Sequence, residues 1–223
     1  MPLVNFHNHL QTSHSNKLIA IKCLDIEESF NPELNGLYTI GLHPWKTNII
    51  DVKTKIELIK AFFENESIIG LGEVGLDKLR GASIEIQKKI LIKQVELAYD
   101  YNKPIIIHCV KAWDELLEVK KGFSNKIPWA VHGFNGSEQQ TKQLIDAGFY
   151  LSVGVSIKNC NSKIATAIKQ IPLNRLFLET DDTNTDIEDI YKTVSQNISI
   201  PLNELEDQLY CNLREFFSLS LKL

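Results

Sequence analysis

The stretch Val4-Asn5-Phe6-His7-Asn8-His9, close to the N-terminus, is the segment from which the fold of this chain can be worked out. The apolar run 3–6 predicts a buried strand that ends in two histidines separated by one residue. Because strand side chains alternate between two faces, His7 and His9 point one way and Asn8 the other. Two imidazoles side by side form half of a transition-metal site. This spacing also occurs by chance, so the interpretation depends on the other strand ends.

The composition is that of an ordinary globular protein. The chain has 223 residues, which is enough for one large domain or two small ones. Its residues are 43% hydrophobic and 23% charged. The net charge of -4 argues against tight nonspecific binding of nucleic acid, although it allows a local basic patch. The 4 cysteines form no C-x-x-C pair, which favours free thiols in a reducing cytosol. No apolar run approaches the roughly 18 residues of a membrane span, and no secretory signal is recognisable. We expect a cytoplasmic monomer.

Apolar strands alternate with amphipathic helices along the chain. Strands are expected at 3–6, 18–24, 37–45, 67–73, 104–109, 129–132, 149–154 and 175–181. Helices are expected at 51–65, 83–102, 112–121, 137–147, 162–170, 187–194 and 202–219, with a helical turn at 25–30. The connection between the first two strands is short for a crossover helix, so the first βα unit is expected to be shortened or irregular.

This alternation predicts one compact domain over residues 1–223 with the α/β fold of a (β/α)₈ barrel of TIM type. A doubly wound open sheet would alternate in the same way. Its glycine-rich phosphate motif should follow the first strand, and His7-Asn8-His9 stands there instead. The barrel is therefore the better interpretation.

The residues at the strand ends have the character of metal ligands. In a (β/α)₈ barrel the carboxyl ends of the strands form the active-site face. Five of the 6 histidines fall there, together with two carboxylates. The set is His7, His9, His43, Glu73, His108, His132 and Asp181. Each alone has a simpler explanation, such as a hydrogen-bonded core histidine or a helix-capping carboxylate, but their shared location predicts a metal centre.

The donor set also indicates a type of chemistry. Imidazoles with a shared carboxylate suit zinc, manganese or iron better than calcium or magnesium alone. Four histidines with Glu73 and Asp181 exceed the needs of one tetrahedral ion, so we expect two ions about 3.5–4 Å apart. Such a pair lowers the pKa of bound water toward about 7, and Asp181 could bind metal and orient or deprotonate that water. The sequence thus predicts metal-assisted hydrolysis.

Seven motifs, in order, resemble those of the TatD family of metal-dependent hydrolases, within the wider amidohydrolase-like barrels. They are His7-Asn8-His9, Gly41-Leu42-His43-Pro44, Gly72-Glu73-Val74-Gly75-Leu76-Asp77, Gln87 to Ala98, Pro104 to His108, Val131 to Gly136, and Leu178-Glu179-Thr180-Asp181. The resemblance covers nearly the whole chain. It implies two divalent ions (zinc, manganese or magnesium) held by His7, His9, Glu73, His108, His132 and Asp181, with Glu73 bridging. It further implies deoxyribonuclease-type phosphodiester hydrolysis, with Asp181 and Glu73 as catalytic residues and DNA or another phosphodiester as the transient partner.

The sequence departs from the family at several positions. Asn5 stands where an acid usually precedes the histidine pair, and Asp182 stands where a proline usually follows Asp181. Val110 replaces an arginine that can meet phosphate two residues after the fifth-strand histidine. Lys111 is next to it, but lysine is a point charge and not a bidentate fork. No departure removes a metal ligand, so hydrolase chemistry is retained, while Val110 leaves the phosphodiester substrate open.

Substrate contacts are expected just beyond the strand ends. The expected contacts are His43, Lys111, Lys78 and Trp45, with Lys46 and Arg80 as further candidates. The three lysines and Arg80 are equally compatible with solvated positions on the surface. Trp45 and Phe134 could stack a base or pack the barrel rim. Cys109 faces away from His108, which argues against a nucleophilic thiol.

Three functions remain open at this point. The first is a metal-dependent nuclease acting on DNA. The second is a hydrolase of amides, esters or lactones, which the replacement of the family arginine by Val110 favours. The third is a non-catalytic barrel, against which the retention of all six expected ligands argues.

Overall fold

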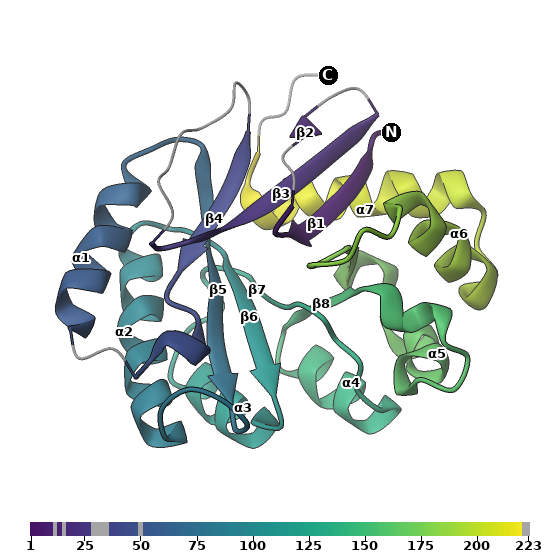
Figure 1. Ribbon diagram of the computed structural model, residues 1–223. Helices are drawn as coiled ribbons and strands as arrows, with labels where there is room; N and C mark the ends of the chain where they lie inside the picture. The colour runs from purple at the N-terminus through teal and green to yellow at the C-terminus, as the bar shows by residue number, and fades with distance from the viewer. Residues whose placement is uncertain (11–12, 15–16, 28–35, 49–50, 220–223) are drawn as a thin grey trace. The chain divides into compact units, whose positions relative to one another are not determined.

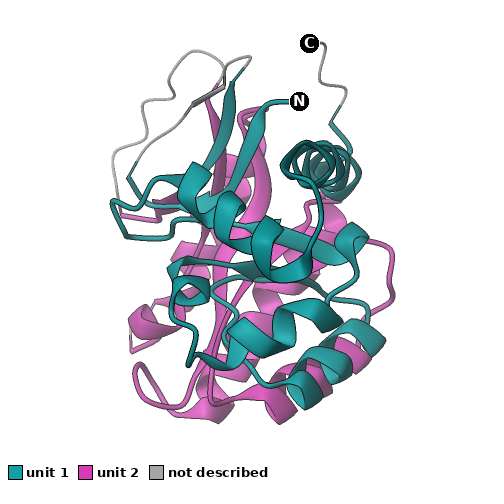
Figure 2. Cartoon of the chain, turned by 90° about the vertical axis from the view of Figure 1, so that its right-hand side faces the viewer, with its two compact units in different colours: residues 1–22, 130–223 teal, residues 23–129 magenta. Residues whose placement is uncertain are grey.

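The computed structural model describes the chain apart from residues 11–12, 15–16, 28–35, 49–50 and 220–223. Strands and helices alternate along it, and the (β/α)₈ fold class expected from the sequence is confirmed (Figure 1). The chain divides into two compact units, which Figure 2 colours separately. Unit 1 is Met1–Lys22 with Ala130–Leu223, and unit 2 is Cys23–Trp129. The expected extent of one domain over residues 1–223 stays a prediction.

Parallel strands form the sheet of unit 1. Strand β1 (Leu3–Asn8) pairs in parallel with β3 (Leu18–Asp25). Strand β8 (Tyr150–Val153) pairs in parallel with β7 (Trp129–Val131) and β9 (Leu176–Leu178). In the described part of the β1–β3 connection there is no helix, and β2 (Ser13–His14) pairs antiparallel with β3 instead. The expected shortening of the first βα unit is therefore confirmed.

Helices follow the strands of unit 1. They are η2 (Val155–Lys158), α4 (Glu138–Asp146), α5 (Lys163–Ala167), η3 (Ile168–Gln170), η4 (Leu173–Arg175), α6 (Ile187–Ile198) and α7 (Leu202–Phe217). A capping box starts α4, because Ser137 and Gln140 each accept a hydrogen bond from the other's backbone N–H. The helix expected at 162–170 is α-helical only to Ala167 and ends as η3. The strand expected at 175–181 ends at Leu178, ahead of a turn at Asp181, whose φ of 53° is left-handed.

Aromatic rings fill the core of unit 1. Phe6 of β1 stacks on Phe177 of β9, with ring centroids 3.9 Å apart and an interplanar angle of 8°. Phe216 of α7 meets both rings edge-on at 5.3 and 5.5 Å, and it meets Tyr150 of β8 at 5.1 Å. Stacked and edge-to-face pairs are the favourable geometries for buried rings. Helix α7 thus packs against three of the strands of unit 1.

A tyrosine of α6 holds the start of β1. The hydroxyl of Tyr191 accepts a hydrogen bond from the Val4 N–H at 3.0 Å and donates one to the Val4 carbonyl at 3.1 Å. Tyr191 is fully buried, and this burial raises the pKa of its hydroxyl. The hydroxyl therefore stays protonated and can make both bonds.

Unit 2 has a parallel sheet in the order β4 (Leu37–Gly41), β5 (Ile68–Asp77) and β6 (Ile105–Val110). All residues of β5 are buried, as expected for a central parallel strand covered on both faces. Strand β5 continues to Asp77, beyond the expected end at Glu73. The strand expected at 37–45 ends at Gly41, because Pro44 starts the helical turn η1 (Pro44–Lys46).

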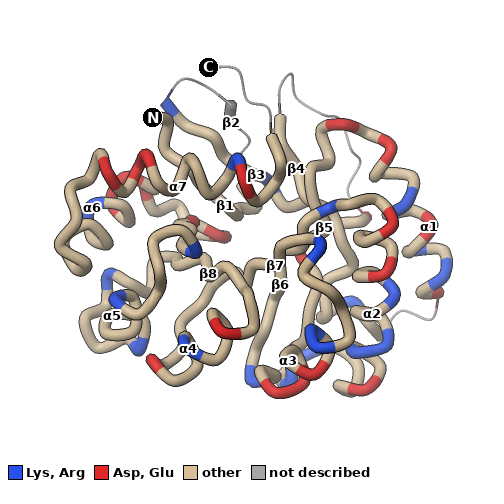
Figure 3. Tube along the Cα trace, turned by 180° about the vertical axis from the view of Figure 1, so that it is seen from behind, with Lys and Arg blue, Asp and Glu red and all other residues tan. Residues whose placement is uncertain are grey.

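The described residues of unit 2 also include α-helices. They are α1 (Val52–Phe63), α2 (Ile84–Asp100) and α3 (Trp113–Lys121). Residues of both charges are spread along α1 and α2 (Figure 3), which is typical of solvent-facing helices. The helical turn expected at 25–30 lies partly outside the described residues. In the part of the chain that the structure describes, no helix is long and apolar enough to cross a membrane.

Replacing Tyr191 with phenylalanine should lower the free energy of unfolding by about 1–3 kcal/mol, because the buried Val4 N–H and carbonyl would lose their partner. Urea unfolding followed by circular dichroism measures this change. Tyr210→Phe is the matched control, since the Tyr210 hydroxyl is buried and has no hydrogen-bond partner among the described residues. Equal losses in the two variants would show that the bonds to Val4 contribute nothing.

Candidate metal centre

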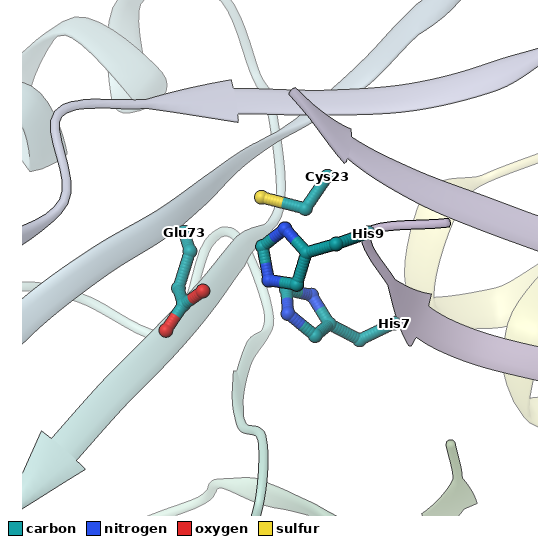
Figure 4. A group of neighbouring side chains, drawn as sticks. All are labelled: His7, His9, Cys23 and Glu73. Carbon is teal, nitrogen blue, oxygen red and sulfur yellow. The ribbon is translucent and has the colours of Figure 1, made fainter. Parts of the chain in front are cut away.

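Unit 1 gathers three imidazoles and a carboxylate at the carboxyl ends of its strands; His7, His9, His132 and Asp181 are called the unit 1 cluster here. His7 and His9 extend side by side from the end of β1 (Figure 4), with ring centroids 5.1 Å apart. The ring of His132, just after β7, lies 4.2 Å from that of His7. Asp181 Oδ1 is 3.7 Å from His7 Nε2 and 3.5 Å from His9 Nε2. The face predicted from strand alternation is thus the one that meets Asp181.

Strand β1 holds Asp181 directly through its backbone. The Asp181 N–H donates to the His7 carbonyl at 3.1 Å, and the Asp181 carbonyl accepts from the His9 N–H at 3.2 Å. Asp181 has the left-handed φ of 53°, a conformation that aspartate and asparagine adopt more readily than most residues. The carboxylate and the two imidazoles therefore belong to backbone segments that are hydrogen-bonded to each other.

Asn5 strengthens the same attachment. Its Nδ2 donates to Thr180 Oγ1 at 2.8 Å, and its Oδ1 accepts from the Thr180 N–H at 3.0 Å. Both residues are buried. An ionised aspartate has no donor, so the asparagine found here supplies both the donor and the acceptor that link β1 to the residue before Asp181.

Glu179, to which the sequence analysis assigned no role, lies behind His132. Its Oε1 accepts from the Gly133 N–H at 2.5 Å and lies 3.4 Å from His132 Nδ1. Burial by itself raises the pKa of this carboxyl, but the hydrogen bond and charge of His132, with the charge of His7, outweigh it and lower the pKa. A carboxylate on one ring nitrogen orients a histidine whose other nitrogen binds metal. The signal in the sequence is a second acid two residues before Asp181.

Unit 2 gathers a second group; His43, Glu73, Asp77 and His108 are called the unit 2 cluster here. Glu73 Oε1 lies 3.0 Å from His43 Nε2 and 2.6 Å from His108 Nδ1. His108 Nε2 lies 3.3 Å from Asp77 Oδ2. Figure 4 shows the Glu73 side chain extending from β5. His43, expected as a substrate contact, therefore shares a carboxylate with the expected ligand His108.

Two buried glutamines of α2 position the chain around this cluster. Gln94 accepts from the Leu42 N–H at 2.7 Å and donates to the Leu42 carbonyl at 3.2 Å, next to His43. Gln87 accepts from the Asp77 N–H at 2.7 Å and donates to the Asp77 carbonyl at 2.8 Å. At the ends of β4 and β5, where strand pairing stops, these two glutamine side chains thus provide the hydrogen-bond partners of the backbone N–H and carbonyl groups.

Asp77, the last residue of the motif Gly72 to Asp77, is an orienting residue whose role is not evident from the sequence. It is 3% exposed, and burial by itself would raise the pKa of its carboxyl. Hydrogen bonds from Trp45 Nε1 at 2.6 Å, from the Leu79 N–H at 2.7 Å and from His108 lower that pKa below its ordinary 3.8. Asp77 is therefore ionised at neutral pH and can hold the His108 ring in place.

The donors of each unit fit a divalent transition-metal ion. In unit 1, one donor atom from each of His7, His132 and Asp181 lies within 4.8 Å of the others. In unit 2 the same holds for His43, Glu73 and His108. Imidazole and carboxylate donors suit zinc and manganese. Four of the expected ligands are thus brought together in unit 1, and Glu73 and His108 are brought together in unit 2.

Comparison with known proteins identifies the family. The family described as TatD related DNase matches residues 8–218. The chain belongs to the TatD family.

A TATDN1 homolog of Enterocytozoon bieneusi is 33% identical over 96% of this chain and 75% of that protein. A protein of Pantoea ananatis named 3'-5' ssDNA/RNA exonuclease TatD is 30% identical over 64% of this chain and 56% of its own length. The crystal structure of YjjV, a TatD homolog of Escherichia coli, superimposes with a TM-score of 0.77 at 25% identity, covering 90% of this chain and 86% of that one.

The TatD family membership makes the chain a metal-dependent hydrolase. Its substrate contacts stay predictions. Lys78 forms an ion pair with Glu115 at 2.7 Å, and Lys46 is paired with Asp25. Lys111 is exposed. The charges of Lys78 and Lys46 are therefore already balanced by protein carboxylates.

The aromatic candidates of this TatD chain differ in exposure. Trp45 is 45% exposed, whereas Phe134 is fully buried. The idea that Phe134 could stack a base is therefore wrong, because its ring packs inside unit 1. Burial raises the pKa of the Cys109 thiol, which agrees with the expectation that it is no nucleophile.

Replacing Asp77 with asparagine should lower the free energy of unfolding at neutral pH by about 1.5–3 kcal/mol, because charge-assisted hydrogen bonds are lost. The pKa of Asp77 is lowered in the folded protein, so its stabilising effect is complete above its ordinary pKa of 3.8 and is lost as the pH falls through the lower, folded value. Urea unfolding of metal-free wild type and variant across acidic and neutral pH measures the difference. A difference that stays constant on acidification would contradict this role.

Proposed function

We propose that this TatD-family hydrolase is a divalent-metal-dependent nuclease that cleaves phosphodiester bonds of DNA. The unit 1 cluster is the observation that carries the proposal, because its carboxylate lies beside two imidazoles and is held there by backbone hydrogen bonds. The name of the Pantoea relative, a single-strand DNA and RNA exonuclease, supports nucleic acid as the substrate class.

Two divalent ions (zinc, manganese or magnesium) are proposed as cofactors. The proposed ligands are His7, His9, Glu73, His108, His132 and Asp181. Bound ions would supply Lewis-acid chemistry and lower the pKa of water. The clusters described in each unit support this ligand set, because each combines imidazole with carboxylate.

The protein's own groups have distinct proposed roles. The side chain of Asp181 is 37% exposed, so it can reach a water molecule, orient it and accept its proton. Glu179 and Asp77 hold the rings of His132 and His108 in one orientation. Glu73, 5% exposed, is a catalytic carboxylate in the proposal. Water would then be activated by residues whose positions are fixed before substrate arrives.

The alternative is a hydrolase of amides, esters or lactones. The observation that favours it is Val110, which stands where the family often has an arginine able to meet phosphate. Valine offers neither charge nor a hydrogen-bond donor to a phosphodiester. Turnover of esters or lactones together with intact DNA would support this alternative.

Asp181→Asn should reduce metal-dependent cleavage of labelled single-stranded DNA by about 100-fold or more, because asparagine cannot accept the proton of water. Asparagine keeps the left-handed backbone conformation, so the fold should be retained. Protein stripped of metal and reloaded separately with zinc, manganese or magnesium is assayed on DNA beside ester and lactone substrates. Asp182→Asn is the matched control, since the neighbouring Asp182 is exposed. An Asp181→Asn variant that cleaves DNA at the rate of wild type would refute the proposal.

Metal content should depend on both clusters. His132→Ala in unit 1 and His108→Ala in unit 2 should each reduce the bound zinc by about one ion per chain, since two-metal sites bind a pair of ions. Inductively coupled plasma mass spectrometry of dialysed protein measures this content. His14→Ala, which removes the one histidine that is neither a proposed ligand nor an expected substrate contact, is the control. Unchanged zinc in the His108 variant would show that Glu73 and His108 hold no ion.

A further inference from the structure

An exposed pair of side chains lies beside the unit 2 cluster. Arg80, in the loop after β5, places its Cζ atom 4.4 Å from the ring centroid of Trp45 in η1. The Trp45 ring lies 4.7 Å from the ring of His43 and 5.8 Å from that of His108. Arg80 and Trp45, called the Arg–Trp pair here, belong entirely to unit 2.

The loops that carry this pair are tied together. The Arg80 carbonyl accepts from Gln87 Nε2 at 2.9 Å, and the Ala82 N–H donates to Thr47 Oγ1 at 3.0 Å. Between them, Gly81 has a φ of +86°, and a Cβ atom there would lie 2.1 Å from the Pro44 carbonyl oxygen. This close approach of the two loops requires glycine. The pair is therefore ordered before any ligand binds, which reduces the entropic cost of binding.

The indole is fixed as well as exposed. Its Nε1 donates to Asp77 Oδ2 at 2.6 Å, while Trp45 as a whole is 45% exposed. Leu79, in the loop that carries Arg80, is a further exposed apolar side chain, at 63%. An aromatic ring that reaches solvent but is held by a buried carboxylate offers a rigid surface on which a base can stack.

The charge of Arg80 is available to a ligand, whereas the charges of Lys78 and Lys46 are balanced by protein carboxylates. Among the described residues Arg80 forms no ion pair, whereas Lys78 is paired with Glu115 and Lys46 with Asp25. A guanidinium presents a planar fork of donors that matches phosphate, and lysine does not. Lys111 is the remaining exposed cation near the end of β6, and it has only a single ammonium group.

We propose that Arg80 binds a backbone phosphate of single-stranded nucleic acid while the Trp45 ring stacks on an adjacent base. This inference rests on the proposed nuclease function and names the residues that receive its substrate. Arg80 would thereby take the place of the phosphate-binding arginine that Val110 replaces. The pair selects unpaired strands, because a base must leave its helix before it can stack on the indole.

The test measures binding with the full-length protein and fluorescein-labelled oligothymidylate joined by phosphorothioate links, which resist cleavage. Fluorescence anisotropy gives the dissociation constant. Arg80→Gln should weaken binding about tenfold, and the slope of log affinity against log salt should fall by about 0.7, as for one lost phosphate contact. Arg80→Lys should fall between wild type and Arg80→Gln, because the charge stays but the fork is lost. Trp45→Ala should weaken binding about 5- to 150-fold.

Lys93→Gln, on the exposed face of α2, is the matched control for the loss of one positive charge. Lys111→Gln tests the competing contact. The inference is supported if Arg80→Gln weakens binding more than Lys111→Gln does, while Lys93→Gln binds like wild type. It is overturned if Arg80→Gln binds like wild type, or if any loss is matched by either lysine variant.

The proposed nuclease function is tested separately by metal-dependent hydrolysis of bis(4-nitrophenyl) phosphate by wild-type protein. If wild-type protein hydrolyses this diester and Arg80→Gln binds oligothymidylate as tightly as wild type, the nuclease proposal stands and the role of Arg80 is refuted. A wild type that binds through Arg80 without hydrolysing the diester keeps the binding site and loses the nuclease assignment.

Discussion

The backbone pairing of β1 with Asp181 is the constraint on which the unit 1 cluster depends. Two backbone hydrogen bonds join Asp181 to His7 and His9, which lie far from it in the sequence. Because strand pairing fixes both the distance and the direction of the paired segments, these bonds set the distance from the Asp181 carboxylate to the two imidazoles. The hydrogen bonds from Asn5 to Thr180 and from Tyr191 to Val4 also hold β1 in place. Loosening β1 would therefore affect the geometry of His7, His9 and Asp181 together.

In both units, buried side chains form hydrogen bonds with backbone groups near the candidate metal ligands. Where β4 and β5 end, their peptide groups would be buried without strand partners, and Gln94 and Gln87 meet them. Because a buried unpaired peptide group costs about 1–3 kcal/mol, these amides both stabilise the loops and leave them little freedom. The histidine and carboxylate side chains that follow the strands are thus carried on backbone that is already ordered.

The electrostatics of the two clusters follow one pattern. A buried carboxylate, Glu179 or Asp77, has its pKa lowered because the hydrogen bonds and charges around it outweigh desolvation. Each acid contacts the ring of a candidate ligand, His132 or His108. An acid in this position favours the proton on the ring nitrogen that it contacts, and it leaves the other nitrogen able to bind a metal ion. Such a pairing suits a site that must be ready for a cation without rearranging.

The sequence by itself determined the fold class and the chemical type of the site. Strand alternation placed His7 and His9 on one face, and apolar runs that end in histidine or an acid carried enough information to expect a hydrolase barrel. Only the tertiary structure decided which side chains meet. It assigned Glu179 and Asp77 to histidines, brought His43 to Glu73, buried Phe134, and left Arg80 over Trp45 without an ion pair among the described residues. The physical reason is that periodicity follows from local backbone geometry, whereas burial, ion pairing and pKa depend on contacts between segments that are distant in the chain.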